Sequence, residues 1–331
     1  MEQTLKEQVN QVELVGTLKS HDIAVKASKK DGSLYISGKA KVEVVEGGNT
    51  NVITVSVFAK EGNKIYDGLQ TVINEYKTTE ELIETTGDKN AKGERIRVRG
   101  EIALEEYVST RTEKLTSFNQ VRGVFFNRIK ETDEAFNAPD YTKVLVEVNI
   151  SAIKPRINKQ GLPSGELTVE GFTVGYNQKI IPIYDLVVGQ ELAQAFKAYY
   201  RPQTTAKLSM RLENYAVAQE PAQQPMNTTA AFGQSFDDIN ERVVYDYVND
   251  FRLVGGDNPY TDFRALTPEQ HEMAQKLRQQ AIDSLGNPKP QTTGFTEGFG
   301  GQDQKQSQEQ IDQQMPFNDT KQTPFNTTPN F

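Results

Sequence analysis

Three arginines alternate with two branched aliphatic residues in the segment ERIRVRGEIAL. Arg95, Arg97 and Arg99 occupy every second position, with Ile96 and Val98 between them. In a β-strand, alternate side chains point to opposite faces, so the three guanidinium groups would share one face. Such a row can bind phosphates, or it can be the ordinary solvated face of an antiparallel sheet. The rest of the sequence has to distinguish these two interpretations.

A second group of candidate binding residues lies upstream of the arginines. The segments LYISGKAKVEV and VITVSVFAK also alternate, so Tyr35, Lys39, Lys41 and Phe58 lie opposite the aliphatic faces. Aromatic rings stack on bases and cations contact the backbone, and this combination is typical of single-strand binding. The rings could instead pack beneath a neighbouring loop or domain. Further cations predicted to contact nucleic acid are Lys26, Lys29, Lys30, Arg111, Lys114, Lys154, Arg156 and Lys159.

Catalytic and metal chemistry has little support in the sequence. The absence of cysteine excludes disulfides, thiolate metal sites and a cysteine nucleophile. His21 and His271 are isolated, which argues against a zinc site or a histidine-dependent triad. A hydrolase built on the adjacent Asp237 and Asp238 is a further alternative, although neighbouring acids in a polar segment are usually only solvated. We therefore expect a protein that is not an enzyme and has no cofactor and no metal.

Length and composition predict two globular domains. The chain has 331 residues, 36% of them hydrophobic, and a formal net charge of -8. A negative net charge does not describe the electrostatic field over one face of a protein. Residues 94 to 130, for example, hold eight Arg or Lys against five Glu. No run approaches the ~20 apolar residues of a membrane span, and the start is too polar for a signal peptide. We expect a cytoplasmic protein without a membrane partner.

The chain repeats one order of elements. In each half, three strand-like segments are followed by a helical segment and two further strands. The best local match pairs RIRVRGEIALEEYV with AKLSMRLENYAVA. The predicted strands are 12–18, 34–45, 51–59, 95–107 and 117–129, then 143–153, 165–175, 179–188, 206–218 and 242–256, with helices over 65–87 and 189–200.

Five strands with a helix between the third and fourth form the order of the OB-fold, a small Greek-key barrel. The predicted fold is therefore mainly β, with two OB-fold-like five-stranded barrels in tandem, a C-terminal helix and a disordered tail. The predicted domains are 1–140, 141–258, a helical segment 259–286 and a polar tail 287–331.

Over residues 10–258 this order resembles tandem OB-fold single-stranded DNA-binding proteins, particularly those of bacteriophages. The resemblance implies a protein that coats exposed strands in phage DNA replication or recombination, in the cytoplasm of a bacterial host. Phe172 and Tyr184 approximately mirror Tyr35 and Phe58, so the second barrel could bind DNA weakly or mediate association. The alternative is a phage structural or adaptor protein that uses its barrels for protein contacts, which the net charge and the absence of tryptophan favour.

The C-terminal region combines one clear helix with a low-complexity segment. Thr267 is a natural N-cap, Pro268 suits the first helical position and Gly286 is a stop signal. We expect this helix to pack on the second barrel, with partner binding as the alternative.

The tail is too poor in aliphatic residues to fold. Its Pro-Phe motifs resemble partner-recruiting tails of single-stranded DNA-binding proteins, which implies contacts with replication or recombination proteins, although the phenylalanines of a solubilising tail could be incidental. The predicted partner-binding residues are Pro316, Phe317, Pro324, Phe325 and Phe331.

Overall fold

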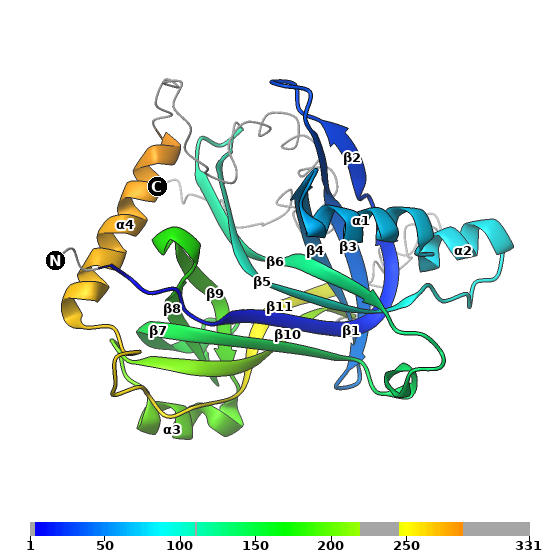
Figure 1. The fold of residues 1–331 in the computed structure, drawn as a ribbon. Helices are drawn as coiled ribbons and strands as arrows, with labels where there is room; N and C mark the ends of the chain where they lie inside the picture. Colours follow the sequence, from blue (N-terminus) through cyan, green and yellow to red (C-terminus); the bar gives the residue numbers. More distant parts are fainter. Residues whose placement is uncertain (1–3, 110, 219–244, 287–331) are drawn as a thin grey trace, which may run out of the picture. The chain divides into compact units, whose positions relative to one another are not determined.

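The computed structural model describes residues 4–109, 111–218 and 245–286, which belong to one compact unit (Figure 1). The predictions made for Asp237, Asp238 and the tail lie outside the described residues. These tail residues are Pro316, Phe317, Pro324, Phe325 and Phe331.

Five strands of the first half close into a barrel. Going round the ring, β1 pairs with β3, β3 with β4, β4 with β6, β6 with β5, and β5 with β1. Only the β4–β6 pairing is parallel, which is the topology of an OB-fold. The short strand β2 (Ala24–Ala27) extends the edge beside β3. The ring strands are β1 (Asn10–His21), β3 (Leu34–Glu46), β4 (Asn49–Lys60), β5 (Arg95–Val108) and β6 (Leu115–Arg128).

Two helices stand where the sequence predicted one over 65–87. Helix α1 (Lys64–Glu75) ends at Tyr76, and α2 (Thr79–Thr86) begins after Thr78. The Thr78 hydroxyl accepts a hydrogen bond from the Glu81 amide at 3.1 Å, while the Glu81 carboxylate reaches back to the Thr78 amide. This capping box starts a new helix inside a continuous helical pattern, so the prediction of a single helix was wrong.

The second half repeats the ring with the same strand order. Strand β7 pairs with β8, β8 with β9, β9 with β11, β11 with β10, and β10 with β7, and the β9–β11 pairing is again the parallel one. The prediction of two five-stranded OB-fold-like barrels, each with helical structure between the third and fourth strands, is confirmed. The elements are β7 (Tyr141–Ile157), β8 (Pro163–Val174), β9 (Ile180–Val188), α3 (Gln190–Tyr199), β10 (Thr205–Ala218) and β11 (Tyr245–Gly256), with short 3-10 turns at Glu134–Asn137 and Tyr176–Gln178.

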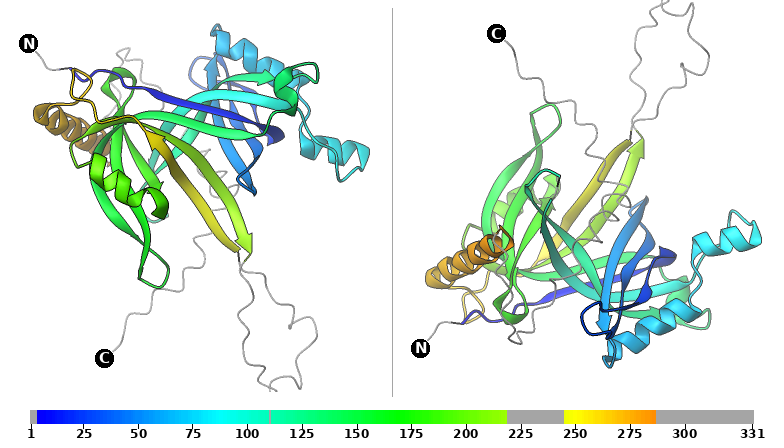
Figure 2. Two further views of the ribbon diagram at one scale, coloured as in Figure 1. Left: turned by 90° about the horizontal axis from the view of Figure 1, so that it is seen from below. Right: turned by 90° about the horizontal axis from the view of Figure 1, so that it is seen from above.

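The two barrels are joined through their first strands. Strand β1 pairs antiparallel with β7, from the Asn10–Val146 pair to the Val15–Tyr141 pair, so one 11-stranded sheet runs through both rings (Figure 2). The Asn51 side chain of β4 also accepts a hydrogen bond from the Asn214 amide of β10 at 2.8 Å. Backbone pairing at the junction makes the two barrels one packed body.

The interior of each barrel follows the alternation seen in the sequence. Ile96, Val98, Ile102 and Leu104 of β5 are all buried, while the arginines between them point outward. Removing one such side chain from water stabilises the fold by ~1.5–3 kcal/mol. The buried face therefore fixes the direction of the arginine row.

Helix α4 (Pro268–Gly286) lies against the second barrel, as expected (Figure 1). Ala274 of α4 and Leu5 of the N-terminal segment form a buried cluster with Phe172, Val174 and Ile180 of β8 and β9. Within the described residues, no helix is long and apolar enough to cross a membrane.

Candidate nucleic-acid interface

An aromatic pair lies on the outer surface of β3 and β4. Phe58 is directly opposite Ser37 across the strand pair, and Tyr35 is its diagonal neighbour. The two ring centroids are 5.6 Å apart with a tilt of 34°, and 38% of Phe58 is exposed. The prediction that both rings face outward from the same surface agrees with this placement.

Lysines surround the aromatic pair in register. Lys39 is opposite Ser56 and Lys41 is opposite Thr54. Tyr35 has Lys26 as its partner on one side and Lys60 on the other. Lys60 was not among the residues predicted from the sequence. Cross-strand partners share a face of the sheet, so these side chains lie on the surface of the rings. We call Tyr35, Phe58, Lys26, Lys39, Lys41 and Lys60 the first-barrel face.

The ion pairs of the described residues leave out the lysines of the first-barrel face. Among the residues described here, Lys26, Lys39, Lys41 and Lys60 form no ion pair within 4.0 Å. Lys60 could have been found from the sequence, because it alternates with Phe58 in VITVSVFAK. Its position beside Tyr35, however, depends on the strand register.

Four other predicted cations lie in turns at the ends of strands. Lys29 and Lys30 are exposed in the turn between β2 and β3. Arg111 and Lys114 are exposed in the turn between β5 and β6. Both turns lie toward the same end of the first barrel (Figure 1). They occupy the positions of the two loops with which OB-folds bind ligands.

The arginine row faces outward, but carboxylates already contact it. Arg95 bonds Asp140 at 2.5 Å, and only 15% of its side chain is exposed. Arg97 and Arg99 share Glu13, at 4.0 and 2.7 Å, and Arg99 remains 57% exposed. Burial would raise the pKa of Glu13, but hydrogen bonds from Tyr141 and Arg99 lower it overall. Arg95 therefore anchors the segment before β7, while Arg99 offers the largest accessible surface of the three.

The predicted cations of the second barrel are all engaged by acids. Lys154 bonds Glu170 at 2.6 Å, and Lys159 contacts Asp246. Arg156 donates two hydrogen bonds to Asp250, at 2.8 and 3.1 Å.

Arg156 belongs to a linear network of alternating charges. From Asp250 the network runs through Arg156 to Glu166, and from there through Arg252 to Glu213. Burial would lower the pKa of Arg252, but hydrogen bonds to Glu166 and Glu213 raise it overall. Arg211 completes the chain by bonding Glu213 at 2.8 Å. Three cations and three carboxylates thus satisfy one another over the strands of the second barrel.

Helix α4 covers part of the outer surface of β8 and β9, where the sequence predicted exposed rings. We call Phe172, Val174 and Ile180 the second-barrel face. Phe172 is only 8% exposed, and the His271 ring of α4 meets it edge-on with centroids 5.8 Å apart. Tyr184 is half-buried and packs against the hydrophobic core. The expectation that Phe172 mirrors the exposed rings of the first barrel was therefore wrong, because α4 occupies this surface.

Acidic side chains line the border between the barrels. Glu105 accepts a hydrogen bond from Gln120, and burial raises the pKa of Glu105 against the opposing charges of Lys179 and Lys39. The neighbouring Glu106 bonds Arg278 of α4 at 2.6 Å. Helix α4 is therefore tied to both barrels.

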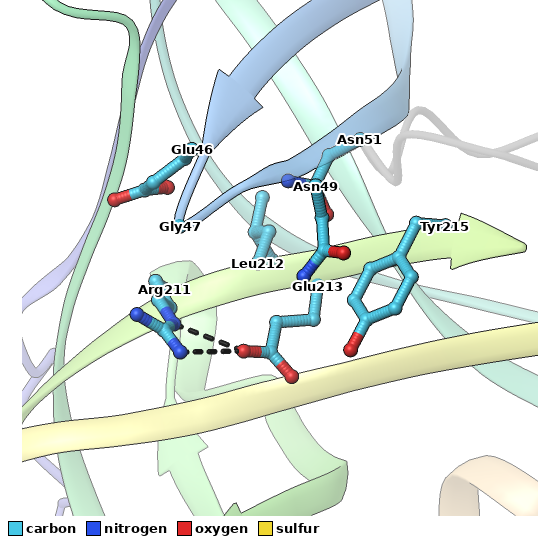
Figure 3. A pocket seen from close by; sticks show the side chains of 8 residues that line it. All are labelled: Glu46, Gly47, Asn49, Asn51, Arg211, Leu212, Glu213 and Tyr215. Carbon is cyan, nitrogen blue, oxygen red and sulfur yellow. Dashed lines mark hydrogen bonds and ion pairs between the residues drawn. The ribbon is translucent and has the colours of Figure 1, made fainter. Parts of the chain in front are cut away.

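The two pockets found among the described residues are small or shallow. A pocket between β4 and β10 holds about 10 Å³, which is room for one water molecule (Figure 3). A shallow groove of about 250 Å³ borders the Lys207–Asp257 ion pair. The described residues contain no cluster of three or more His, Cys, Asp or Glu able to hold a metal ion. The small pocket is lined by Glu46, Gly47, Asn49, Asn51, Arg211, Leu212, Glu213 and Tyr215.

Comparison with protein families assigns the chain to one of them. The YorF family model matches residues 8–288. The chain belongs to the YorF family. A search of curated proteins found no match for this YorF-family chain.

Among solved structures, the chain is similar to the single-stranded DNA-binding protein from Thermus aquaticus. A deletion mutant of that protein is 16% identical over 80% of this chain and 100% of its own, with a TM-score of 0.43. The wild-type protein is 15% identical over 80% of this chain and 99% of its own, also with a TM-score of 0.43. A chain of a Replication Protein A heterotrimer bound to single-stranded DNA is 10% identical over 89% of this chain and 56% of its own, with a TM-score of 0.19. Likenesses of this size support no functional conclusion.

Proposed function

We propose that this protein binds single-stranded DNA without sequence preference through the first-barrel face. The observation that carries the proposal is the Tyr35–Phe58 ring pair, at 5.6 Å, with lysines on the same surface. Base stacking on such rings contributes ~1–3 kcal/mol per base and tolerates every base, because each has a π-face. Lysines supply the sequence-independent contact with phosphates.

The biological setting belongs to the same proposal. We infer a protein that is not an enzyme and that coats and protects exposed strands in phage DNA replication or recombination, in the cytoplasm of a bacterial host. The tail motifs at Phe317, Phe325 and Phe331 would recruit replication or recombination proteins. An aromatic anchor on a polar tether suits a short recognition motif, which supports this part of the proposal.

The direct test is fluorescence anisotropy with labelled oligo-dT, its duplex and the matching RNA, at two salt concentrations. We expect tighter binding of the single strand, weakening as salt rises with a slope of about -0.7 per phosphate contacted. Phe58→Ala should weaken binding about tenfold with the fold intact. Tyr176→Ala, an exposed aromatic residue of the second barrel, is the matched control and should change nothing.

Absence of binding at low salt would contradict the proposal and favour the structural or adaptor function. One observation supports that second function. Ile157 and Leu162 are exposed around the turn between β7 and β8, where apolar side chains suit a protein partner. Binding by wild-type protein that Phe58→Ala leaves unchanged would remove Phe58 from the site.

A further inference from the structure

A glycine bulge interrupts the pairing of β5 and β6. Gly100 pairs with Gly123, whereas the preceding Arg99 pairs with Phe125, so Val124 is an extra residue in β6. A Cβ at Gly100 would lie 1.9 Å from the Arg122 carbonyl oxygen. Only glycine therefore permits this close approach of the two backbones.

The bulge reverses which phenylalanine faces outward. Arg122 points outward, so uninterrupted alternation would turn Phe126 outward and bury Phe125. The extra residue instead places Phe126 opposite the buried Val98, where it packs against the core. Phe125 is 55% exposed as a result. Bulges commonly re-aim side chains in this way near binding sites.

Cations flank the exposed ring. The register places Lys143, Glu13, Arg99 and Phe125 in one row across β7, β1, β5 and β6. Lys143 is exposed and forms no ion pair with another described residue. Lys143 is three strand spacings from Phe125, or about 14 Å. The charged side chains along this row and beside it on β5 and β6 comprise four cations and two carboxylates. The cations are Arg97, Arg99, Arg122 and Lys143, and the carboxylates are Glu13 and Glu101.

The sheet connects this surface to the first-barrel face. Lys39 pairs with Ser56, and Ser56 is the register partner of Arg122. Two strand spacings separate Lys39 from Arg122, or about 10 Å. Phe125 follows Arg122 by three residues, about another 10 Å along β6.

We propose that Phe125 is a second stacking position for the same single strand. In this arrangement the strand passes from the Tyr35–Phe58 pair over Arg122 to Phe125, and Arg99 and Lys143 contact its phosphates. The inference rests on the proposed function, and it extends the binding surface onto β5 and β6. It also gives Arg99 a role that its partial pairing with Glu13 leaves open, since a guanidinium has donors beyond those used by one carboxylate.

The absence of tryptophan in the chain allows a direct readout. Phe125→Trp introduces a single tryptophan, which can be excited selectively over the 13 tyrosines. Stacking of a base on it should quench its emission when oligo-dT of about 30 nucleotides is added, a length above the ~4–16 nucleotides covered by one OB-fold. Phe58→Trp is the positive control for the first-barrel face. Phe263→Trp is the negative control, because this ring is 81% exposed but follows the last strand of the second barrel.

Binding affinities complete the test. Phe125→Ala and Phe125→Leu should each weaken oligo-dT binding about tenfold, whereas Phe125→Tyr should retain it, because stacking needs a ring rather than apolar area. Circular dichroism of each variant verifies the fold. Quenching at position 58 without quenching at 125 would overturn this inference and leave the proposed function intact.

Two other results would also overturn the inference. If wild-type protein fails to bind oligo-dT at low salt, the proposed function fails and this extension fails with it. If the emission of Phe125→Trp changes with protein concentration alone and oligo-dT has no effect, the surface contacts a second copy of the chain instead.

Discussion

The first-barrel face and the second-barrel face occupy corresponding strands of the same topology, yet one is exposed and the other is covered. The first carries a tilted ring pair and lysines without ion-pair partners among the described residues. The second is buried beneath Ala274 of α4 and Leu5, and in its barrel Arg156, Arg211 and Arg252 are paired with carboxylates. One strand order can therefore leave rings and lysines exposed in one barrel and form a packing surface in the other.

The largest expected effect concerns the cover over the second-barrel face. Ala274 is 1% exposed, so Ala274→Glu would place a charge in an apolar contact. We expect the free energy of unfolding to fall by about 3 kcal/mol in chemical denaturation. Gln275→Glu, on the exposed side of the same helix, is the control and should be nearly neutral.

DNA affinity of the Ala274→Glu variant then tests the comparison itself. Affinity should stay within about twofold of wild type, since the first-barrel face is separate. A clear gain in affinity would break the comparison, because it would show that the second-barrel face binds DNA once uncovered.

The next effect concerns the ion network of the second barrel. Asp250→Asn removes the charge of the carboxylate that accepts two hydrogen bonds from Arg156. The substitution should lower the free energy of unfolding by about 2 kcal/mol. Asp246→Asn, which loses the more exposed contact with Lys159, should cost less than about 1 kcal/mol. Equal losses in the two variants would mean that the network adds no cooperative stability.

Two matched double variants separate the predicted DNA contacts of the barrels. Lys39→Ala with Lys41→Ala should make the dependence of log affinity on log salt shallower by about 1.4 for oligo-dT. Lys154→Ala with Lys159→Ala should change it less, because Glu170 and Asp246 already pair with these lysines. Titration at several salt concentrations measures both slopes. A larger change from the second pair would reverse the assignment of the binding surface.

The smallest effect is the pH dependence of the α4 anchor. Burial would raise the pKa of Glu106, but hydrogen bonds from Arg278 and Ser117 and the charge of Arg278 hold it below its ordinary 4.5. The stabilisation is therefore present above pH 4.5 and is lost as the pH falls through the lowered pKa.

Glu106→Gln should accordingly cost about 1 kcal/mol at neutral pH and almost nothing in acid, as measured by denaturation across that range. The control is Glu272→Gln on the exposed side of α4, which should show no such convergence with wild type. A constant difference at every pH would show that Glu106 acts through packing rather than charge.

Much of the architecture could be predicted from local patterns. Alternation at Ile96 and Val98 identified the buried side of β5, and Thr267 marked the start of α4. The same reasoning failed between α1 and α2, because the capping box at Thr78 competes with a helical pattern that continues through it. The outward position of Phe125 was not predicted, because the bulge in β6 changes the alternation of the strand.

Local sequence patterns were enough to predict the strand order, the outward direction of Tyr35, Phe58 and the arginines, and the existence of α4. These features depend on residues two to four positions apart, whose spacing is visible in the chain. Only the tertiary structure decided which cations are neutralised and which faces are covered. Arg156 meets Asp250 across 94 positions, and Arg278 meets Glu106 across 172. Such pairings follow from the closure of two barrels, which no local spacing encodes.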